Sequence, residues 1–349
     1  MGGGAFSEMC GIILVTVINK RIILMMTPKY SDNKFLQLAF AVFFLTFLVQ
    51  CKKDLSVADN SGRKGEVQSP QNKDSIQQQD AVVKTKIKYS SFIFPTKKRD
   101  SAMADFNKKF SEKEQYAILA LNRLDAKNKW RADTLAIPDK VDTTLMMYSP
   151  FPSHLEILKD VKKIAVFSYP VQAYALYEKG NLIKWGPTSM GKKAAQTKRG
   201  LMFANWKKEL AISTVNSSWK LPYNVNVHNT LGIGWHQFDL PGFPASHSCL
   251  RLLMADAKYM YQWVDTWVLN KGGATVRANG TPVIVFGDYN WGGKKPWKQL
   301  IQNADADQIS AETLNTVIEP HISKILEEQQ KREQALSSPE ASEAKIPAA

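Results

Sequence analysis

The spacing of apolar and polar positions changes along this chain of 349 residues, and each change predicts a different kind of element. Residues 164–167 and 173–177 are short runs of β-forming side chains separated by turn residues. Residues 181–185 follow Glu178-Lys179-Gly180 at the spacing of a hairpin with glycine at its turn. Residues 164–185 are therefore expected to form β-strands.

A helical spacing occurs in residues 254–269. Apolar side chains recur there every three or four positions and form one face: Ala257, Met260, Tyr261, Val264, Trp267 and Val268. The pair Gly272-Gly273 ends this pattern. Residues 112–124 also have a helix-like spacing, and the apolar positions within residues 313–326 predict a terminal helix.

The run of residues 35–50 is uncharged and mostly apolar, and it follows Lys34. It is shorter than the about 20 residues that a membrane-spanning helix needs, and it has the length of a signal-peptide core. It ends at Cys51 in a sequence similar to a lipoprotein signal-peptidase site, although Gln50 is larger than the usual small residue. We expect residues 1–51 to be a targeting region with a lipid at Cys51, or else an uncleaved anchor; both export the rest.

A second apolar stretch, residues 11–18, lies upstream of the pair Met25-Met26. Translation that started at either methionine would leave a signal peptide of ordinary shape. We therefore expect the residues before them to be an upstream extension of the reading frame. The alternative is a short membrane hairpin of two helices.

The composition changes after the targeting region. Residues 54–88 are rich in Ser, Gln, Asn, Asp and Lys and contain no aromatic residue, which predicts a disordered linker over residues 52–89. A small ordered unit is expected over residues 90–142. The last part of the chain, residues 301–349, is expected to hold the terminal helix and a frayed polar tail.

The formal net charge is +14, with an isoelectric point near 9.5. Such a balance would ordinarily favour nucleic acid as a partner, but export argues against it, and anionic lipid or wall polymer explains the surplus better. The five histidines include no His-x-x-x-His pair, and the exported part has no second cysteine. We therefore expect no metal site and no cofactor.

The three cysteines are Cys10, Cys51 and Cys249, and only Cys249 lies beyond the targeting region. Exported proteins normally use cysteines in pairs, so a single thiol indicates reactivity unless it is a buried, inert side chain. His236 and His247 shortly precede Cys249. An imidazole can take the proton of a thiol, and the thiolate then attacks a carbonyl. This segment therefore predicts an acyl-transfer enzyme.

The same segment resembles the signature of L,D-transpeptidases of the YkuD type, which cross-link peptidoglycan. After His236, residues 240–245 read Leu-Pro-Gly-Phe-Pro-Ala and residues 246–251 read Ser-His-Ser-Cys-Leu-Arg. The resemblance extends from about residue 163 to 287. It includes Thr-Lys-Arg-Gly at 197–200 and a closing strand at 280–285. Two residues depart from the pattern: Ser248 stands where the family has glycine, and Lys198 where it has proline.

The resemblance implies a fold that is mainly β with α+β character. It implies a YkuD-like β-sandwich over residues 143–300, with a helix after the nucleophile loop. Residues 122–125 and 133–138 resemble the second half of a LysM peptidoglycan-binding module. Residues 90–142 are accordingly expected to be a LysM-like unit or a plain packing subdomain.

The resemblance also implies the roles of site residues. Cys249 would attack a stem tetrapeptide, with His236 as the general base, His247 as its rival, and backbone amides around Ser248 holding the oxyanion. His228 is better explained as a structural histidine. The residues assigned to substrate binding are Arg251, Trp235 and Ser246; Arg251 could instead pair with an internal acid, and Trp235 could lie in the core.

The function that these roles predict is peptidoglycan L,D-transpeptidation through a cysteine acyl-enzyme, in a periplasmic or envelope lipoprotein that acts on stem peptides. If water resolves the intermediate, the enzyme is an L,D-carboxypeptidase. A cysteine peptidase on wall peptides is also compatible with the sequence. So is an inactive peptidoglycan-binding lipoprotein, for which Ser248 is the best sequence argument.

Overall fold

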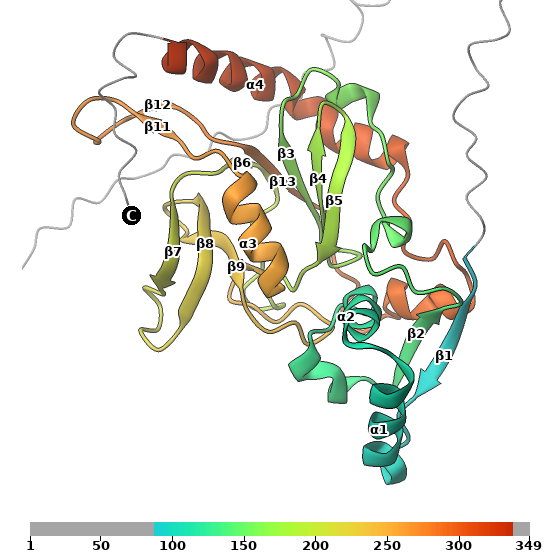
Figure 1. Cartoon of the computed structure of the whole chain (residues 1–349). Helices are drawn as coiled ribbons and strands as arrows, with labels where there is room; N and C mark the ends of the chain where they lie inside the picture. The colour runs from blue at the N-terminus through green and yellow to red at the C-terminus, as the bar shows by residue number, and fades with distance from the viewer. Residues whose placement is uncertain (1–86, 338–349) are drawn as a thin grey trace, which may run out of the picture. The chain divides into compact units, whose positions relative to one another are not determined.

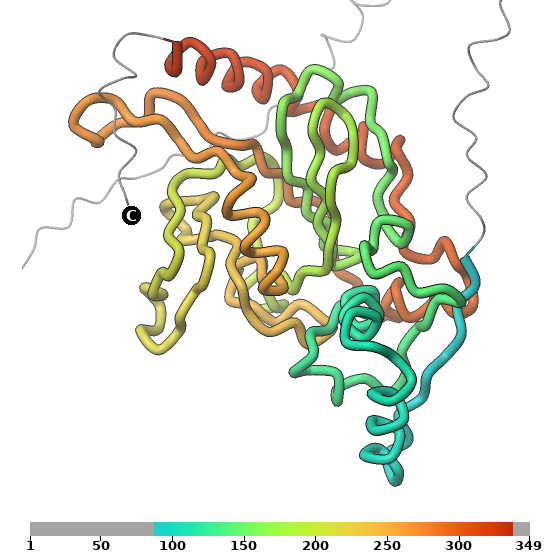
Figure 2. The backbone as a smooth tube through the Cα atoms, viewed as in Figure 1, coloured from blue at the N-terminus to red at the C-terminus, as the bar shows by residue number. Residues whose placement is uncertain are grey.

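The computed structural model describes residues 87–337, drawn in colour in Figures 1 and 2. The expected targeting region with Cys51, nearly all of the expected linker and the end of the expected tail lie outside these residues. No helix within residues 87–337 combines the length and the apolar character needed to cross a membrane.

A five-stranded sheet forms around β3, in the order β5-β4-β3-β13-β6. β3 and β13 are parallel, and the other neighbours are antiparallel. The bounds of its strands are β3 (Ile164–Ser168), β4 (Ala173–Glu178), β5 (Asn181–Pro187), β6 (Gly200–Phe203) and β13 (Pro282–Phe286). The strands expected from about residue 164 are thus confirmed.

The turn between β4 and β5 is the hairpin that its glycine predicts. Lys179 and Gly180 both have positive φ, 47° and 80°, as the two central residues of a type I′ turn require. A Cβ at Gly180 would come within 2.7 Å of the Leu155 carbonyl oxygen, so the close approach of this backbone also favours glycine.

A four-stranded sheet has the order β10-β9-β8-β7. Its short strand β10 runs parallel to β9, and the other pairs are antiparallel. The bounds are β7 (Lys207–Ile212), β8 (Lys220–His228), β9 (Ile233–Gln237) and β10 (Leu250–Leu252). A separate hairpin pairs β11 (Val268–Leu269) with β12 (Val276–Ala278).

One hydrophobic core lies between the two large sheets and includes α3 (Met254–Trp263). It contains Phe167 from β3, Trp235 from β9 and Met260 from α3. The opposite face of the five-stranded sheet buries Ile164 and Val166 against residues of α2 (Glu112–Leu121) and α4 (Ala311–Ser337). The architecture is therefore mixed α/β with several sheets, with more helix than a mainly β fold.

The first part of the described chain has the order strand, helix, helix, strand. β1 (Tyr89–Ile93) and β2 (Thr134–Pro138) are antiparallel, and α1 (Arg99–Lys109) and α2 lie between them in sequence. Ser111 and Glu114 form a capping box at the start of α2. The short 3₁₀ helices of the chain are Thr96–Lys98, Ala126–Arg131, Met146–Tyr148, Glu156–Leu158 and Pro296–Ile301.

This first part is bonded directly to the loop after β9. The Asp125 carboxylate accepts a hydrogen bond from the Leu240 N–H at 2.6 Å, and the Asp125 N–H donates to the Leu240 carbonyl at 3.2 Å. Arg123 is fully buried, donates to the Val171 carbonyl and pairs with Asp307 at 2.9 Å. These contacts join Arg123 and Asp125 to the rest of the described chain.

The helix expected over residues 254–269 is wrong in its second half. α3 ends at Trp263, and Val264 is already extended. The following backbone finds partners far away in sequence: the Trp267 N–H donates to the Asn205 carbonyl, and the Thr281 N–H donates to the Asp265 carbonyl. These tertiary hydrogen bonds outweigh the local helical spacing.

Candidate active site

The side chains around Cys249 are sorted by the alternation of β9 and β10. Leu250 lies opposite Trp235, and Arg251 lies opposite His236. Leu250 and Trp235 point into the core and are fully buried. His236, Cys249 and Arg251 line a cavity of about 510 Å³ on the other face. The strand pairing therefore brings the predicted nucleophile and base to one cavity.

Gly234 allows β8 and β9 to approach closely beside the cysteine. A Cβ at this position would lie 2.5 Å from the Val225 carbonyl oxygen, so only glycine fits. The Cys249 thiol donates weakly to the Gly232 carbonyl at 3.8 Å. Burial raises the pKa of the Cys249 thiol, and a backbone hydrogen bond from Gly234 and the charge of Arg251 offset part of this effect.

The His236 ring is held by one hydrogen bond through Nδ1. It is 4% exposed, and its Nδ1–H donates to the Gln237 carbonyl at 2.9 Å, so Nε2 carries the free lone pair. Burial lowers the pKa of His236 to about 4; the charge of Arg251 also lowers it, whereas the hydrogen bond to Gln237 raises it. The imidazole is therefore neutral at physiological pH.

The charged thiolate expected from the sequence is not the resting form. A raised thiol pKa and a lowered imidazole pKa leave both groups neutral, and no hydrogen bond joins them within residues 87–337. Desolvation in the cavity is the cause for both groups.

The loop before Cys249 is not extended. Ser248 has φ of 84°, the left-handed region that favours glycine. Two hydroxyls hold the loop: Thr197 Oγ1 donates to the Ser248 carbonyl at 2.8 Å, and Ser246 Oγ donates to the Cys249 carbonyl at 2.5 Å. Within the described chain, the N–H groups of Ser248 and Cys249 have no recorded hydrogen-bond acceptor.

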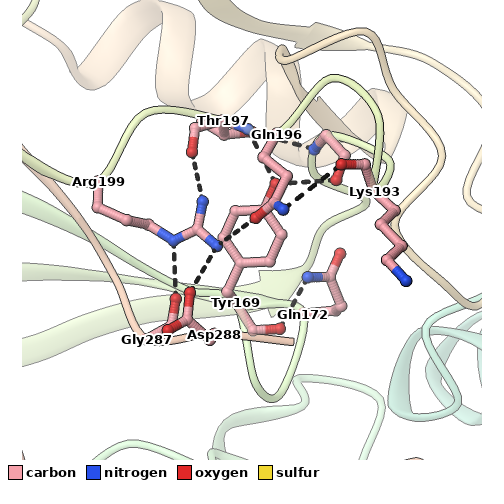
Figure 3. A network of polar contacts seen from close by, with 9 residues as sticks. Tyr169, Gln172, Lys193, Gln196, Thr197, Arg199, Gly287 and Asp288 are labelled. Carbon is pink, nitrogen blue, oxygen red and sulfur yellow. Dashed lines mark hydrogen bonds and ion pairs between the residues drawn. The ribbon is translucent and has the colours of Figure 1, made fainter. Parts of the chain in front are cut away.

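A network behind this loop holds Thr197 in place, as Figure 3 shows. The Tyr169 hydroxyl donates to the Gly191 carbonyl at 2.8 Å and accepts from the Thr197 N–H at 2.9 Å. The Arg199 guanidinium lies 3.5 Å from the centre of the Tyr169 ring and donates to the Gly287 carbonyl. The sequence drew attention to 197–200 only through the family resemblance, and it gave no signal for Tyr169.

His247 and His228 both contact lysines. His247 is exposed, its Nε2 lies 2.7 Å from Lys192 Nζ, and its ring lies 4.9 Å from that of Trp219. Slight desolvation and the charges of Lys192 and Arg251 lower its pKa. His228 lies 3.0 Å from Lys198 and accepts from a backbone N–H of the same turn. His236 is buried and has a free Nε2 lone pair, whereas the exposed His247 and the half-buried His228 each contact a lysine, so His236 is the better candidate base.

The three residues assigned to substrate binding have different surroundings. Arg251 donates to the Asp239 carbonyl at 3.3 Å and lies over the Phe238 ring, and no ion pair is recorded for it within residues 87–337. The acid nearby is Asp239: burial lowers the pKa of Arg251 and the charge of Asp239 raises it by less, but the Asp239 carboxylate pairs with Lys127 at 2.9 Å. Trp235 is corrected to the core, since alternation turns it away from the cavity. Ser246 lines the cavity, but its hydroxyl is used to hold the loop.

Comparisons with known proteins match part of the chain to one family. Residues 162–285 match the family model of the YkuD L,D-transpeptidase catalytic domain. The chain is similar to a solved L,D-transpeptidase from Stackebrandtia nassauensis (23% identity over 37% of this chain and 57% of that chain, TM-score 0.31). It is similar to another from Mycobacterium smegmatis (19% identity over 36% of this chain and 59% of that chain, TM-score 0.29). It is also similar to one from Xylanimonas cellulosilytica (18% identity over 49% of this chain and 79% of that chain, TM-score 0.34). The chain thus covers less than two thirds of the first two structures. No curated protein matches it.

Proposed function

Residues 162–285 form an L,D-transpeptidase catalytic domain of the YkuD family, and we propose that this chain cross-links peptidoglycan stem peptides through Cys249. The family acts on peptidoglycan peptides, which gives the substrate class. The observation that carries the proposal is that a thiol, a neutral imidazole with a free Nε2 lone pair and a guanidinium line one cavity.

In the acylation step, Cys249 Sγ attacks the carbonyl of the L-centre of a diamino acid in a tetrapeptide stem. His236 Nε2 takes the thiol proton as the carbon–sulfur bond forms. The tetrahedral intermediate then expels the terminal D-alanine, whose amine receives that proton from His236. A thioester acyl-enzyme remains.

The N–H groups of Ser248 and Cys249 are the candidates for binding the oxyanion, since neither has a recorded acceptor within residues 87–337. The Thr197 and Ser246 hydroxyls hold this backbone, so the direction of the N–H groups is set before the substrate arrives. Arg251 would bind a substrate carboxylate bidentately. An amine of a second stem then attacks the thioester, and His236 accepts its proton and returns it to the sulfur.

The test is incubation of the purified protein with a stem tetrapeptide, followed by mass spectrometry. We expect a dimer that has lost one D-alanine, and no product from Cys249→Ala. A tripeptide without dimer would establish a carboxypeptidase or peptidase instead, because water would then be the acceptor. An intact tetrapeptide with wild-type protein would contradict both activities and favour the inactive lipoprotein.

The family consists of cell-wall enzymes, which implies an envelope location. Attachment through a lipid at Cys51, or through an uncleaved anchor, is part of our proposal. A lipid-modified mature N-terminus at Cys51, detected by mass spectrometry of the membrane fraction, is expected. A mature chain that begins at another residue, or one that retains residues 35–50, would exclude lipidation.

A further inference from the structure

The cavity beside Cys249 continues over strand β8. The side chains of β8 alternate between two environments: Val225 and Val227 lie in the core, whereas Asn224 and Asn226 line the cavity. β8 lies between β7 and β9 in the sheet (Figure 1). Amide side chains of β8 therefore face the same cavity as the catalytic groups.

The register places each asparagine in the same row across the sheet as one catalytic group. Asn226 lies opposite Gly234, and Val225 lies opposite Trp235. The same antiparallel register, continued by one residue, sets Asn224 opposite His236. Asn226 thus lies in the row of the nucleophile and Asn224 in the row of the base.

The two asparagines differ in their hydrogen bonds. Asn226 Oδ1 accepts from Asn205 Nδ2 at 2.9 Å. Asn224 is 5% exposed, and its carboxamide makes no hydrogen bond within residues 87–337 but is accessible from the cavity. The other buried polar side chains of this cavity, His236 and Ser246, are each bonded to a backbone carbonyl. The Asn224 amide is thus open to the cavity with both its donor and its acceptor groups unused by the described part of the protein, which leaves them available to a ligand.

We propose that the Asn224 carboxamide binds a backbone peptide group of the stem peptide and so fixes the position of the scissile carbonyl over Cys249. One carboxamide offers a donor and an acceptor, which match the C=O and N–H of a peptide unit. This inference rests on the proposed function for its substrate class. It adds a recognition residue for uncharged backbone, complementary to Arg251 for carboxylate.

The test measures binding, so that it is independent of turnover. Calorimetry gives the Kd of a stem tetrapeptide for Cys249→Ala and for Cys249→Ala/Asn224→Ala. It is repeated with analogues in which each backbone amide in turn is an ester, which removes one N–H donor. We expect Asn224→Ala to weaken binding about 10-fold. One particular ester should weaken binding to Cys249→Ala by a similar factor. The same ester should cause no further weakening in Cys249→Ala/Asn224→Ala.

Asn229→Ala is the matched control. Asn229 also lines the cavity, but it is exposed and accepts from Trp206 Nε1 at 3.1 Å, so its effect should multiply with that of every ester. If the fold-change in Kd caused by every ester also multiplies with the fold-change caused by Asn224→Ala, the inference is overturned. It is also overturned if the peptide does not bind. If one ester and Asn224→Ala have non-additive effects on the binding free energy, but the wild type forms no product, the inference is upheld and the proposed function is refuted.

Discussion

The two faces of the four-stranded sheet assign opposite roles to neighbouring residues. Trp235 is fully buried, with its ring centre 6.1 Å from that of Phe167, whereas His236, the next residue, lines the cavity. Leu250 lies in the core, and Cys249 before it faces the cavity. Alternation along a strand, more than nearness in sequence, decides which side chains can reach a substrate.

The largest expected effect comes from the base on the cavity face. His236→Ala should lower the rate of Cys249 acylation by about 10²- to 10⁴-fold, because general-base catalysis contributes about that much. Stopped-flow acylation with a carbapenem measures it. His228→Ala is the control and should change the rate little. Equal losses for the two variants would show that the base has been assigned wrongly.

On the core face, Trp235→Ala should destabilise the fold by about 3–5 kcal/mol, because it leaves a large cavity between the sheets. Denaturant unfolding measures this loss. Trp235→Phe should cost much less, since the Trp235 Nε1–H has no hydrogen bond to lose within the described structure. A stable Trp235→Ala protein that fails to acylate would reverse the assignment of the two faces.

The buried imidazole links the cavity face to pH. His236 binds a proton near pH 6.5 when unfolded and at a pKa of about 4 when folded. The unfolded state therefore binds more protons between these values. The stability is fully present above pH 6.5 and falls as the pH drops toward 4, by up to about 3 kcal/mol. Unfolding free energies across this range, compared with His236→Gln, isolate the effect; identical profiles would contradict the buried neutral ring.

Support of the cysteine loop is expected to have a smaller effect. Thr197→Val removes the donor to the Ser248 carbonyl and the acceptor for the Gly191 N–H, which should slow acylation about 10-fold. Thr197→Ser keeps both bonds and should restore the rate. If Thr197→Val is acylated as fast as Thr197→Ser, the loop does not depend on this hydroxyl.

The smallest effect concerns backbone strain next to the nucleophile. Ser248→Gly should raise the free energy of unfolding by about 1 kcal/mol, because glycine adopts a positive φ without strain. Ser248→Ala keeps the strain and should show no gain. Thermal unfolding compares them, and a stabilised alanine variant would locate the effect in the hydroxyl instead.

The sequence could predict the strands β3, β4 and β5, the start of α3 and the single cysteine beyond the targeting region, because these depend on local spacing and on composition. The sequence also contains the alternation of apolar and polar positions in these strands: Trp235 precedes His236, and Leu250 follows Cys249. This alternation argues against a place for Trp235 in the cavity. Applied to these strands, period two would have favoured the core for that tryptophan.

Other features depend on partners that local pattern does not reveal. The end of α3 is set by bonds to Asn205 and Thr281, and Tyr169 acts through Gly191 and Thr197. The lowered imidazole pKa follows from the burial of the His236 ring, which the residue spacing along one strand does not reveal. Sequence reasoning therefore expected a charged thiol where the fold keeps a neutral pair.

The central claim is that Cys249 is an acylatable nucleophile in this cavity. Intact-mass measurement after incubation with a carbapenem tests it most directly. We expect one covalent adduct on the wild type, mapped to Cys249, and none on Cys249→Ala. An unmodified wild type, or an adduct that persists in Cys249→Ala, would contradict the claim.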